Sequence, residues 1–321
     1  MKIVLYIFAF FVLAISPFFG EITLSLSDIF NTSNSSNMVF WDLRVPRVVL
    51  AFFVGGILSL GGLIFQIIFK NELITPYTLG IASGTTLFTA VAIVFFPMMN
   101  ITISSIFGSI VTILVLYFIS KKINKNSVAV STNSILLIGI SLSYFYGSAL
   151  MLVFYMSNLQ ENYSIIRFTL GSLDTVGFTN SLIVMIISLL FYGIVHFHKE
   201  KIKLLLICND TAFLKGLNVN KISLLLLIVV SLSVGISISF VGPIGFIGLV
   251  IPHVIKLIYK QSADKLFFPV FFFGGIFLVF SDLISRNLNT DSTLPIGVVT
   301  AFIGAPFFVY LLIRRNKKVQ N

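Results

Sequence analysis

Long apolar stretches separated by short polar segments run along the whole chain, and they limit what it can fold into. Hydrophobic residues make up 57% of the 321 residues and charged residues only 10%, whereas about 25% of a soluble domain is charged. A membrane-spanning helix needs roughly 20 apolar residues, so a chain of this length holds about ten spans with short loops. We therefore expect one all-α integral membrane domain over residues 1–321.

The apolar stretches predict ten transmembrane helices. They cover approximately residues 3–20, 47–69, 76–96, 102–120, 133–156, 179–197, 221–241, 246–258, 266–284 and 295–313. The first stretch resembles a signal peptide, but it lacks a small-x-small cleavage site and is expected to remain as a span. The eighth is short for a span, and a helix break formed by Gly242, Pro243 and Gly245 separates it from the seventh.

The basic residues test this topology, because cytoplasmic loops of membrane proteins carry an excess of Lys and Arg. With the N-terminus inside, four of the 21 basic residues lie on the outer side and the other 17 on the inner side. The four outer residues are Arg44, Arg47, Arg167 and Arg286. This segregation predicts that both termini are cytoplasmic. The formal charge of +10 is spread over six inner segments, so we expect membrane lipid as a partner and no nucleic acid.

Several motifs that would give the chain a chemistry of its own are missing. The sequence has no Gly-x-x-x-x-Gly-Lys-Ser/Thr segment to hold ATP and no His-Glu-x-x-His segment to hold a metal. Its one cysteine, Cys208, excludes an intramolecular disulfide and a multi-cysteine metal cluster. We therefore expect no catalytic residue, metal or cofactor on this chain. A secondary transporter would need more charges within its spans, and an intramembrane enzyme would need a catalytic dyad or a metal set.

Two of the outer arginines lie in unusual positions. Pro46 suits the first turn of the second span, and Arg44 and Arg47, three residues apart, share one helix face. Cations at a helix N-terminus oppose its dipole by roughly 0.3–1 kcal/mol, and the positive-inside rule also disfavours them outside. Arg286 follows Asp282 by four residues at the outer end of the ninth span. These guanidiniums would suit carboxylates on a docking partner; anchoring to lipid headgroups is the alternative.

The inner loop between the sixth and seventh spans has the pattern of a short capped helix. Asn209 or Asp210 would cap it, and Gly216 would end it with a positive φ. Leu214 contributes to an apolar face. The segment could fit a cleft in a cytoplasmic partner or lie on the membrane surface.

Small residues spaced four apart predict close contacts between membrane helices. Gly80 and Gly84 have this spacing, as do Gly297, Ala301 and Ala305. The pattern indicates a packed bundle and carries no information about a substrate.

Five stretches of the chain together resemble a known family. They are Leu43-Arg44-Val45-Pro46-Arg47, Asn71 to Gly84, Asp210-Thr211-Ala212 with Gly216, Gly242 to His253, and Asp282 to Pro306. In this order they resemble the iron-siderophore, haem and vitamin B12 importer permease family. The resemblance implies the transmembrane permease of a binding-protein-dependent ABC importer in the bacterial cytoplasmic (inner) membrane. Its substrate would be an iron chelate such as a ferric siderophore or haem, with vitamin B12 as the alternative.

The resemblance also implies partners and residue roles. A second permease copy or a paralogue would pair with the chain, two cytoplasmic ATPase subunits would bind ATP and Mg, and an extracytoplasmic substrate-binding protein would dock outside. The implied roles are docking for Arg44, Arg47 and Arg286, coupling to the ATPase for Asp210, Thr211, Ala212, Leu214 and Gly216, an inner gate for Asn71 and Leu73, and a pathway lining for Ser141 and Ser143.

One departure from the family pattern lies beside the expected gate. The family has Asn-Pro-Leu-Ala where this chain has Asn71, Glu72, Leu73 and Ile74. A carboxylate therefore replaces a proline next to the gate residues.

Overall fold

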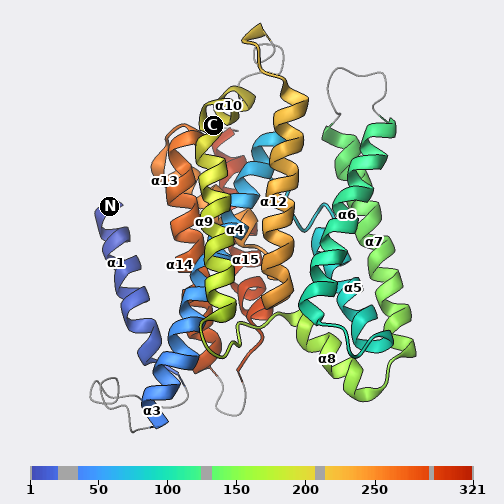
Figure 1. The fold of residues 1–321 in the computed structure, drawn as a ribbon. Helices are drawn as coiled ribbons and strands as arrows, with labels where there is room; N and C mark the ends of the chain where they lie inside the picture. The colour runs from blue at the N-terminus through green and yellow to red at the C-terminus, as the bar shows by residue number, and fades with distance from the viewer. Residues whose placement is uncertain (1, 21–34, 124–131, 207–213, 289–292, 320–321) are drawn as a thin grey trace.

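The computed structural model describes residues 2–20, 35–123, 132–206, 214–288 and 293–319, and the regular structure in these ranges is helical. The helices are α1 (Lys2–Ile15), α3 (Ser35–Met38), α4 (Val45–Ile68), α5 (Ile81–Phe95), α6 (Ile101–Ile123), α7 (Thr132–Met156), α8 (Leu159–Leu170), α9 (Thr179–Phe197), α10 (Lys199–Leu206), α12 (Val219–Val241), α13 (Ile247–Tyr259), α14 (Phe267–Asn287) and α15 (Ile296–Val319). The 3-10 turns η1 (Ser16–Phe18) and η3 (Ala263–Leu266) adjoin α1 and α14, and a π-helical turn, η2 (Val39–Arg44), joins α3 to α4. Most of the long helices run side by side, and α8 lies across the lower right end of the bundle (Figure 1).

Each of the ten predicted ranges overlaps one of these helices. Among the described residues, 6 helical stretches are long and apolar enough to cross a membrane, and four shorter apolar helices accompany them. Three described helices were not predicted: the one-turn α3, which is short and polar, and α8 and α10, in which charged residues interrupt the apolar pattern. The start of α8 is nevertheless marked by a reciprocal capping box, in which Asn158 and Glu161 each accept from the other's backbone N–H.

The predicted start of the second span is wrong. The helical stretch runs without interruption over Ser36–Ile68, so Pro46 lies inside it and does not open it. Arg44 and Arg47 are therefore not at a helix N-terminus, and the expected opposition to the helix dipole does not apply to them.

The chain accommodates Pro46 within this helix through the π-helical turn. A proline has no N–H, so the carbonyl four residues earlier, that of Asp42, loses its intrahelical donor. In the wider π turn, the N–H of Val45 reaches back to the carbonyl of Phe40. The Asp42 carbonyl instead accepts the N–H of Gly177 at 2.7 Å, from the segment between α8 and α9.

The helix α4 forms the centre of the bundle and contacts α9, α12, α13 and α14. Its glycines make this possible: a Cβ added at Gly62 would lie 2.0 Å from the carbonyl oxygen of Gly248 in α13. A Cβ at Gly55 would lie 2.3 Å from the carbonyl oxygen of Gly274 in α14. The backbones are thus too close for any side chain between them, as small residues allow in membrane bundles.

The predicted small-residue pair at the start of α5 has two separate roles. Gly84 packs closely, since a Cβ there would lie 2.0 Å from Oγ1 of Thr112 in α6. Gly80 caps the N-terminus of α5 with a φ of 79°, a left-handed conformation that glycine adopts without a steric penalty.

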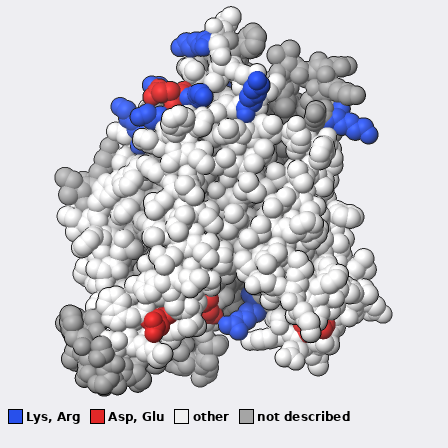
Figure 2. Space-filling view, in the orientation of Figure 1, with Lys and Arg blue, Asp and Glu red and all other residues white. Residues whose placement is uncertain are grey.

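Lys and Arg side chains gather at one end of the molecule on the face shown in Figure 2, over α10 and the neighbouring helix ends. A smaller charged group lies at the opposite end. In Figure 1, α1 runs away from the basic end and α15 runs toward it, so the two chain termini point to the same side. We refer to the basic end as the inner end and to the opposite end as the outer end.

Candidate functional site

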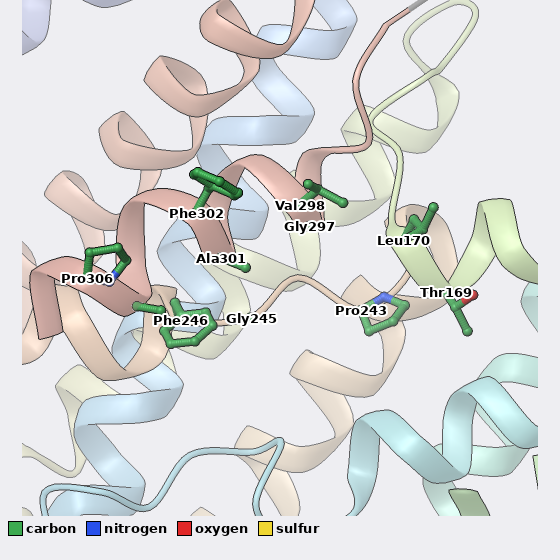
Figure 3. A pocket seen from close by; sticks show the side chains of 11 residues that line it. Thr169, Leu170, Pro243, Gly245, Phe246, Gly297, Val298, Ala301, Phe302 and Pro306 are labelled. Atoms are coloured by element: carbon green, nitrogen blue, oxygen red, sulfur yellow. The ribbon is translucent and has the colours of Figure 1, made fainter. Parts of the chain in front are cut away.

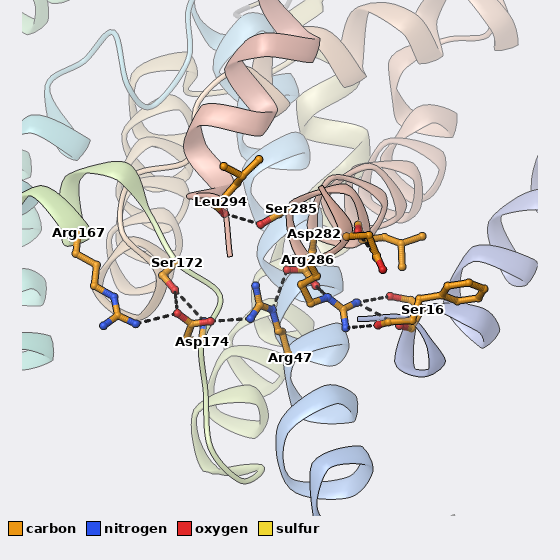
Figure 4. Close-up of polar contacts among 12 residues, drawn as sticks. Ser16, Arg47, Arg167, Ser172, Asp174, Asp282, Ser285, Arg286 and Leu294 are labelled. Atoms are coloured by element: carbon orange, nitrogen blue, oxygen red, sulfur yellow. Dashed lines mark hydrogen bonds and ion pairs between the residues drawn. The ribbon is translucent and has the colours of Figure 1, made fainter. Parts of the chain in front are cut away.

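Two of the three arginines expected to dock a partner, Arg47 and Arg286, come together around a buried aspartate at the outer end (Figure 4). Asp282 in α14 is 0% exposed. Nε of Arg47 donates to its Oδ1 at 2.8 Å, and Nε of Arg286 lies 3.0 Å from its Oδ2 as an ion pair one helical turn away. A carboxylate buried between two guanidiniums holds both in place, because either charge alone would be costly to bury.

Arg44 and Arg286 also hold the end of α1. Each donates to two backbone carbonyls of residues 16–19, where a helix end leaves carbonyls without intrahelical donors. The contacts are Arg44 Nη1 to Pro17 O at 3.2 Å and Phe18 O at 2.9 Å, Arg286 Nη2 to Ser16 O at 3.2 Å and Ser16 Oγ at 3.0 Å, and Arg286 Nη1 to Phe19 O at 3.1 Å. Arg44 and Arg286 are only 6% and 5% exposed, so they are not the fully outward side chains that the sequence suggested.

Asp174, in the segment between α8 and α9, extends the cluster toward solvent. Its Oδ1 accepts from Nη1 of Arg47 at 2.6 Å, and its Oδ2 accepts from Oγ of Ser172 at 2.6 Å and from Nη2 of Arg167 at 3.0 Å. Burial alone would raise the pKa of Asp174, but the Ser172 hydrogen bond and the charges of Arg47 and Arg167 outweigh it and hold the pKa below its ordinary value. Sequence reasoning missed Asp174, because no pattern marks a lone acid in a loop.

Arg167 lies in helix α8 and shares Asp174 with Arg47. The ion pairs form a chain from Arg167 through Asp174, Arg47 and Asp282 to Arg286, which ties α8, α4 and α14 together at the outer end.

A pocket of about 550 Å³ opens beside this chain of ion pairs. The charged side chains that line it are Arg44, Arg47, Arg286 and Asp174. Three guanidiniums thus face one carboxylate there, and this excess of positive charge suits an anionic ligand such as a carboxylate.

At the inner end, the expected gate residues lie in the loop after α4. Oδ1 of Asn71 accepts the N–H of Leu73 at 2.9 Å, which shapes the turn, and the Leu73 side chain is 53% exposed. Oε2 of Glu72 lies 3.9 Å from Nδ1 of His253 in α13. The carboxylate that departs from the family pattern therefore faces a histidine across the α4–α13 boundary.

The helix break between α12 and α13 meets the loop before α5. The phenolic oxygen of Tyr77 accepts the N–H of Ile244, so the loop holds the break directly. Gly242 adopts a φ of 72°, and a Cβ there would lie 2.3 Å from the carbonyl oxygen of Phe168. Tyr77 was not singled out from the sequence, although it lies within the Asn71 to Gly84 stretch.

Pro243 and Gly245 from this break line an apolar groove of about 540 Å³ beside α15 (Figure 3). Gly297, Ala301 and Ala305 supply its other wall. The small residues of α15 therefore do more than pack helices, because their short side chains leave this groove open.

The two pathway serines of α7 point in different directions. Ser141 is exposed. Ser143 is half-buried and donates to the Gly139 carbonyl at 2.9 Å, and its Oγ lies near Gly80. Only Ser141 thus faces outward from the subunit.

The coupling residues Asp210, Thr211 and Ala212 lie outside the described residues. Leu214 is 83% exposed. Gly216 adopts a φ of 77°, which confirms the positive φ expected for it.

Comparison with known proteins identifies the family of this chain. Residues 7–314 match the model of the FecCD transport family. The chain belongs to this family. It is 34% identical to an iron chelatin transport system permease protein of Helicobacter pylori, over 88% of this chain and 84% of the relative. It is 28% identical to the hemin transport system permease protein HmuU of Yersinia pestis, over 93% and 91% of the two chains.

Other FecCD relatives point to more than one cargo. The vitamin B12 import system permease protein BtuC of Vibrio vulnificus is 29% identical over 92% of this chain and 88% of its own. A solved structure of a metal-chelate type ABC transporter in an inward-facing conformation shares 26% identity, covers 97% of both chains and superposes with a TM-score of 0.87. This FecCD protein is thus a multi-pass ABC importer permease of the metal-chelate type and not a catalytic enzyme.

Proposed function

We propose that this FecCD protein translocates an iron chelate, a ferric siderophore or haem, across the bacterial cytoplasmic membrane. The relative with 34% identity carries iron chelatin in its name, and this similarity is the observation that favours an iron chelate. Vitamin B12 is the second candidate, because BtuC of Vibrio vulnificus is similar over most of the chain.

In the proposed topology, ten helices cross the membrane and both termini are cytoplasmic. The 6 long and four shorter apolar helices supply the ten spans, and the basic residues gathered at the inner end support a cytoplasmic location for that end (Figure 2).

The proposed complex contains a second permease copy or a paralogue, two ATPase subunits at the inner end and a substrate-binding protein at the outer end. The chain itself carries no cofactor, and ATP and Mg belong to the ATPase subunits. Leu214 and Gly216, with the neighbouring Asp210, Thr211 and Ala212, would couple to the ATPase. Asn71 and Leu73 would form the inner gate, and Ser141 would face the pathway.

Uptake by a deletion strain with and without the chain tests the substrate. We expect the chain to restore uptake of a labelled ferric siderophore or of haem, but not of cobalamin. Restoration of cobalamin uptake alone would replace the iron chelate by vitamin B12 and leave the importer role intact. No restored uptake with any of the three would contradict the proposal.

The docking role is tested by reversing one charge. Arg47→Glu places a carboxylate against Asp282 and Asp174, so binding-protein affinity for the reconstituted transporter should fall at least tenfold. Arg47→Lys keeps the charge but loses the fork geometry and should give an intermediate loss. Gln160→Glu, an exposed position on α8, is the control for added negative charge. Docking that is unchanged in Arg47→Glu at low and high salt would reduce the arginines to structural anchors.

The coupling role is tested at Gly216. A Cβ there meets no atom of the described residues within 4 Å, so we expect Gly216→Val to act through its positive φ. We expect transport to fail while membrane insertion persists, and Gly216→Asn to retain activity because asparagine tolerates this conformation. Normal uptake by Gly216→Val would favour a helix on the membrane surface.

A further inference from the structure

The two aspartates that contact Arg47 are held in different ways. Asp282 is part of helix α14, is 0% exposed and has both oxygens against guanidiniums. Asp174 lies in the irregular segment 171–178, and its side chain is 39% exposed. The first is a fixed part of the bundle, whereas solvent or a partner can reach the second.

The contacts of Asp174 divide between its two oxygens. Oδ1 accepts only from Arg47 among the described contacts, while Oδ2 accepts from Ser172 and Arg167. Loss of the Arg47 contact would therefore leave Asp174 with two partners on its own side. A solvent-reachable ion pair contributes about 0–1 kcal/mol, so a carboxylate from outside can replace it.

The replacement of Asp174 on Arg47 would affect the helices that line the interior groove of the permease. The carbonyl of Gly171, at the start of this segment, accepts the N–H of Ile296 in the first turn of α15. Leu170, one residue earlier, lines the groove beside α15. The segment that carries Asp174 thus connects α4, through Arg47, to the helix that forms this groove.

We propose that Asp174 is an internal stand-in for a carboxylate of the docking protein, which occupies Arg47 until that carboxylate takes its place. On exchange, Oδ1 of Asp174 leaves Nη1 of Arg47, and the segment 171–178 loses its ionic link to α4. The inference rests on the proposed docking role of the arginines and adds the residue that competes with docking.

The test uses a small carboxylate and the one tryptophan of the chain. Trp41 is 45% exposed, and Val39 and Leu43, two residues to either side of it, line the pocket; its fluorescence is the signal followed in the titration. The full-length permease in nanodiscs is titrated with tricarballylate, and with its uncharged triamide as a blank. We expect Asp174→Asn to bind tricarballylate about three- to fivefold more tightly than the parent, the range that corresponds to an exposed ion pair.

Two further variants separate competition from general charge effects. Asp42→Asn removes a carboxylate that neither lines the pocket nor forms an ion pair among the described residues, and it should bind like the parent. Arg167→Gln removes a partner that holds Asp174 once it has left Arg47, so this variant should bind about twofold more weakly. This exposed change keeps the test open if Asp174→Asn does not fold. Equal or weaker binding by a folded Asp174→Asn, or unchanged binding by Arg167→Gln, would show that Asp174 is scaffold and overturn the proposal.

The stand-in and the docking role can fail separately. Tighter tricarballylate binding by Asp174→Asn, together with normal transport by Arg47→Glu, would keep the exchange of carboxylates and reject docking at this pocket. Weaker tricarballylate binding together with lost docking in Arg47→Glu would reject the stand-in and keep docking.

Discussion

The helices α4 and α7 are both long and apolar, yet the bundle uses them in opposite ways. In the most apolar window of the α4 stretch 83% of residues are buried, against 17% in that of α7. Hydropathy does not separate the two roles, because both helices are long and apolar enough to cross a membrane. The glycines of α4 do, because they let α13 and α14 approach its backbone.

The outward face of α7 carries side chains that lipid alone would not select. Tyr144 and Tyr155 are 76% and 90% exposed, and Ser141 and Ser148 are exposed on the same face. Their spacings of three, four and seven residues place them in one stripe along the helix. A stripe with hydroxyl groups suits contact with a second subunit or an aqueous path better than contact with hydrocarbon. The helix α4 therefore forms the core of the subunit, whereas α7 forms part of its outer surface.

The largest effect is expected from filling the space beside a glycine of α4. Gly62→Val would push Cβ to 2.0 Å from the Gly248 carbonyl oxygen, a backbone clash that costs more than about 3 kcal/mol. We expect little monodisperse protein in detergent and a large fall in the thermal midpoint. The matched change in α7 is Gly147→Val, where a Cβ meets nothing within 4 Å. Equal stability of the two variants would break the comparison.

A smaller effect should separate the two faces of α7 itself. Ser143→Leu presses toward Gly80, whose Cβ position lies 3.4 Å from Ser143 Oγ, and overpacking of this kind costs about 1–3 kcal/mol. Ser141→Leu points outward and should leave the thermal midpoint unchanged while it alters transport. The two measurements are thermal unfolding of the isolated subunit and uptake in cells. Loss of stability in Ser141→Leu alone would reverse the assignment of the faces.

The smallest effect concerns the charged outer end of α4, which α7 lacks. The pKa of Asp174 is lowered in the folded protein, so its ion pair with Arg47 contributes stability above the ordinary pKa, about 3.9, and loses it as pH falls through the lower folded value. The thermal midpoint of Asp174→Asn should therefore lie slightly below that of the parent from pH 5 to 8 and converge with it only as the pH falls below the lowered folded pKa of Asp174. A difference that stays constant into acid would come from packing and not from charge.

The sequence predicted the helices well because span length and hydrophobicity act over many residues. The predicted start of the α4 stretch was wrong because the prediction used the local preference of proline for the first turn of a helix. The carbonyl of Asp42, which loses its intrahelical donor to Pro46, instead accepts the N–H of Gly177, far along the chain. The capping box at Asn158 and Glu161 was visible in the sequence and could have revealed α8. The location of the arginines on one side of the membrane was predicted from topology. Their meeting and their burial depend on the end of α1, on Asp282 and on Asp174, which no local pattern connects to them.

The contacts at the end of α1 also set an order of assembly for the membrane protein. Ser16 is made early, but its partner Arg286 is 270 residues away and leaves the ribosome only after α14 has been synthesised. Until then the outer end of α1 lacks its hydrogen bonds to Arg286. The first helix to reach the membrane is therefore among the last to be held in its final position. A chain that stops before α14 should leave α1 free to drift in the bilayer, where quality-control proteases can recognise an unfinished permease.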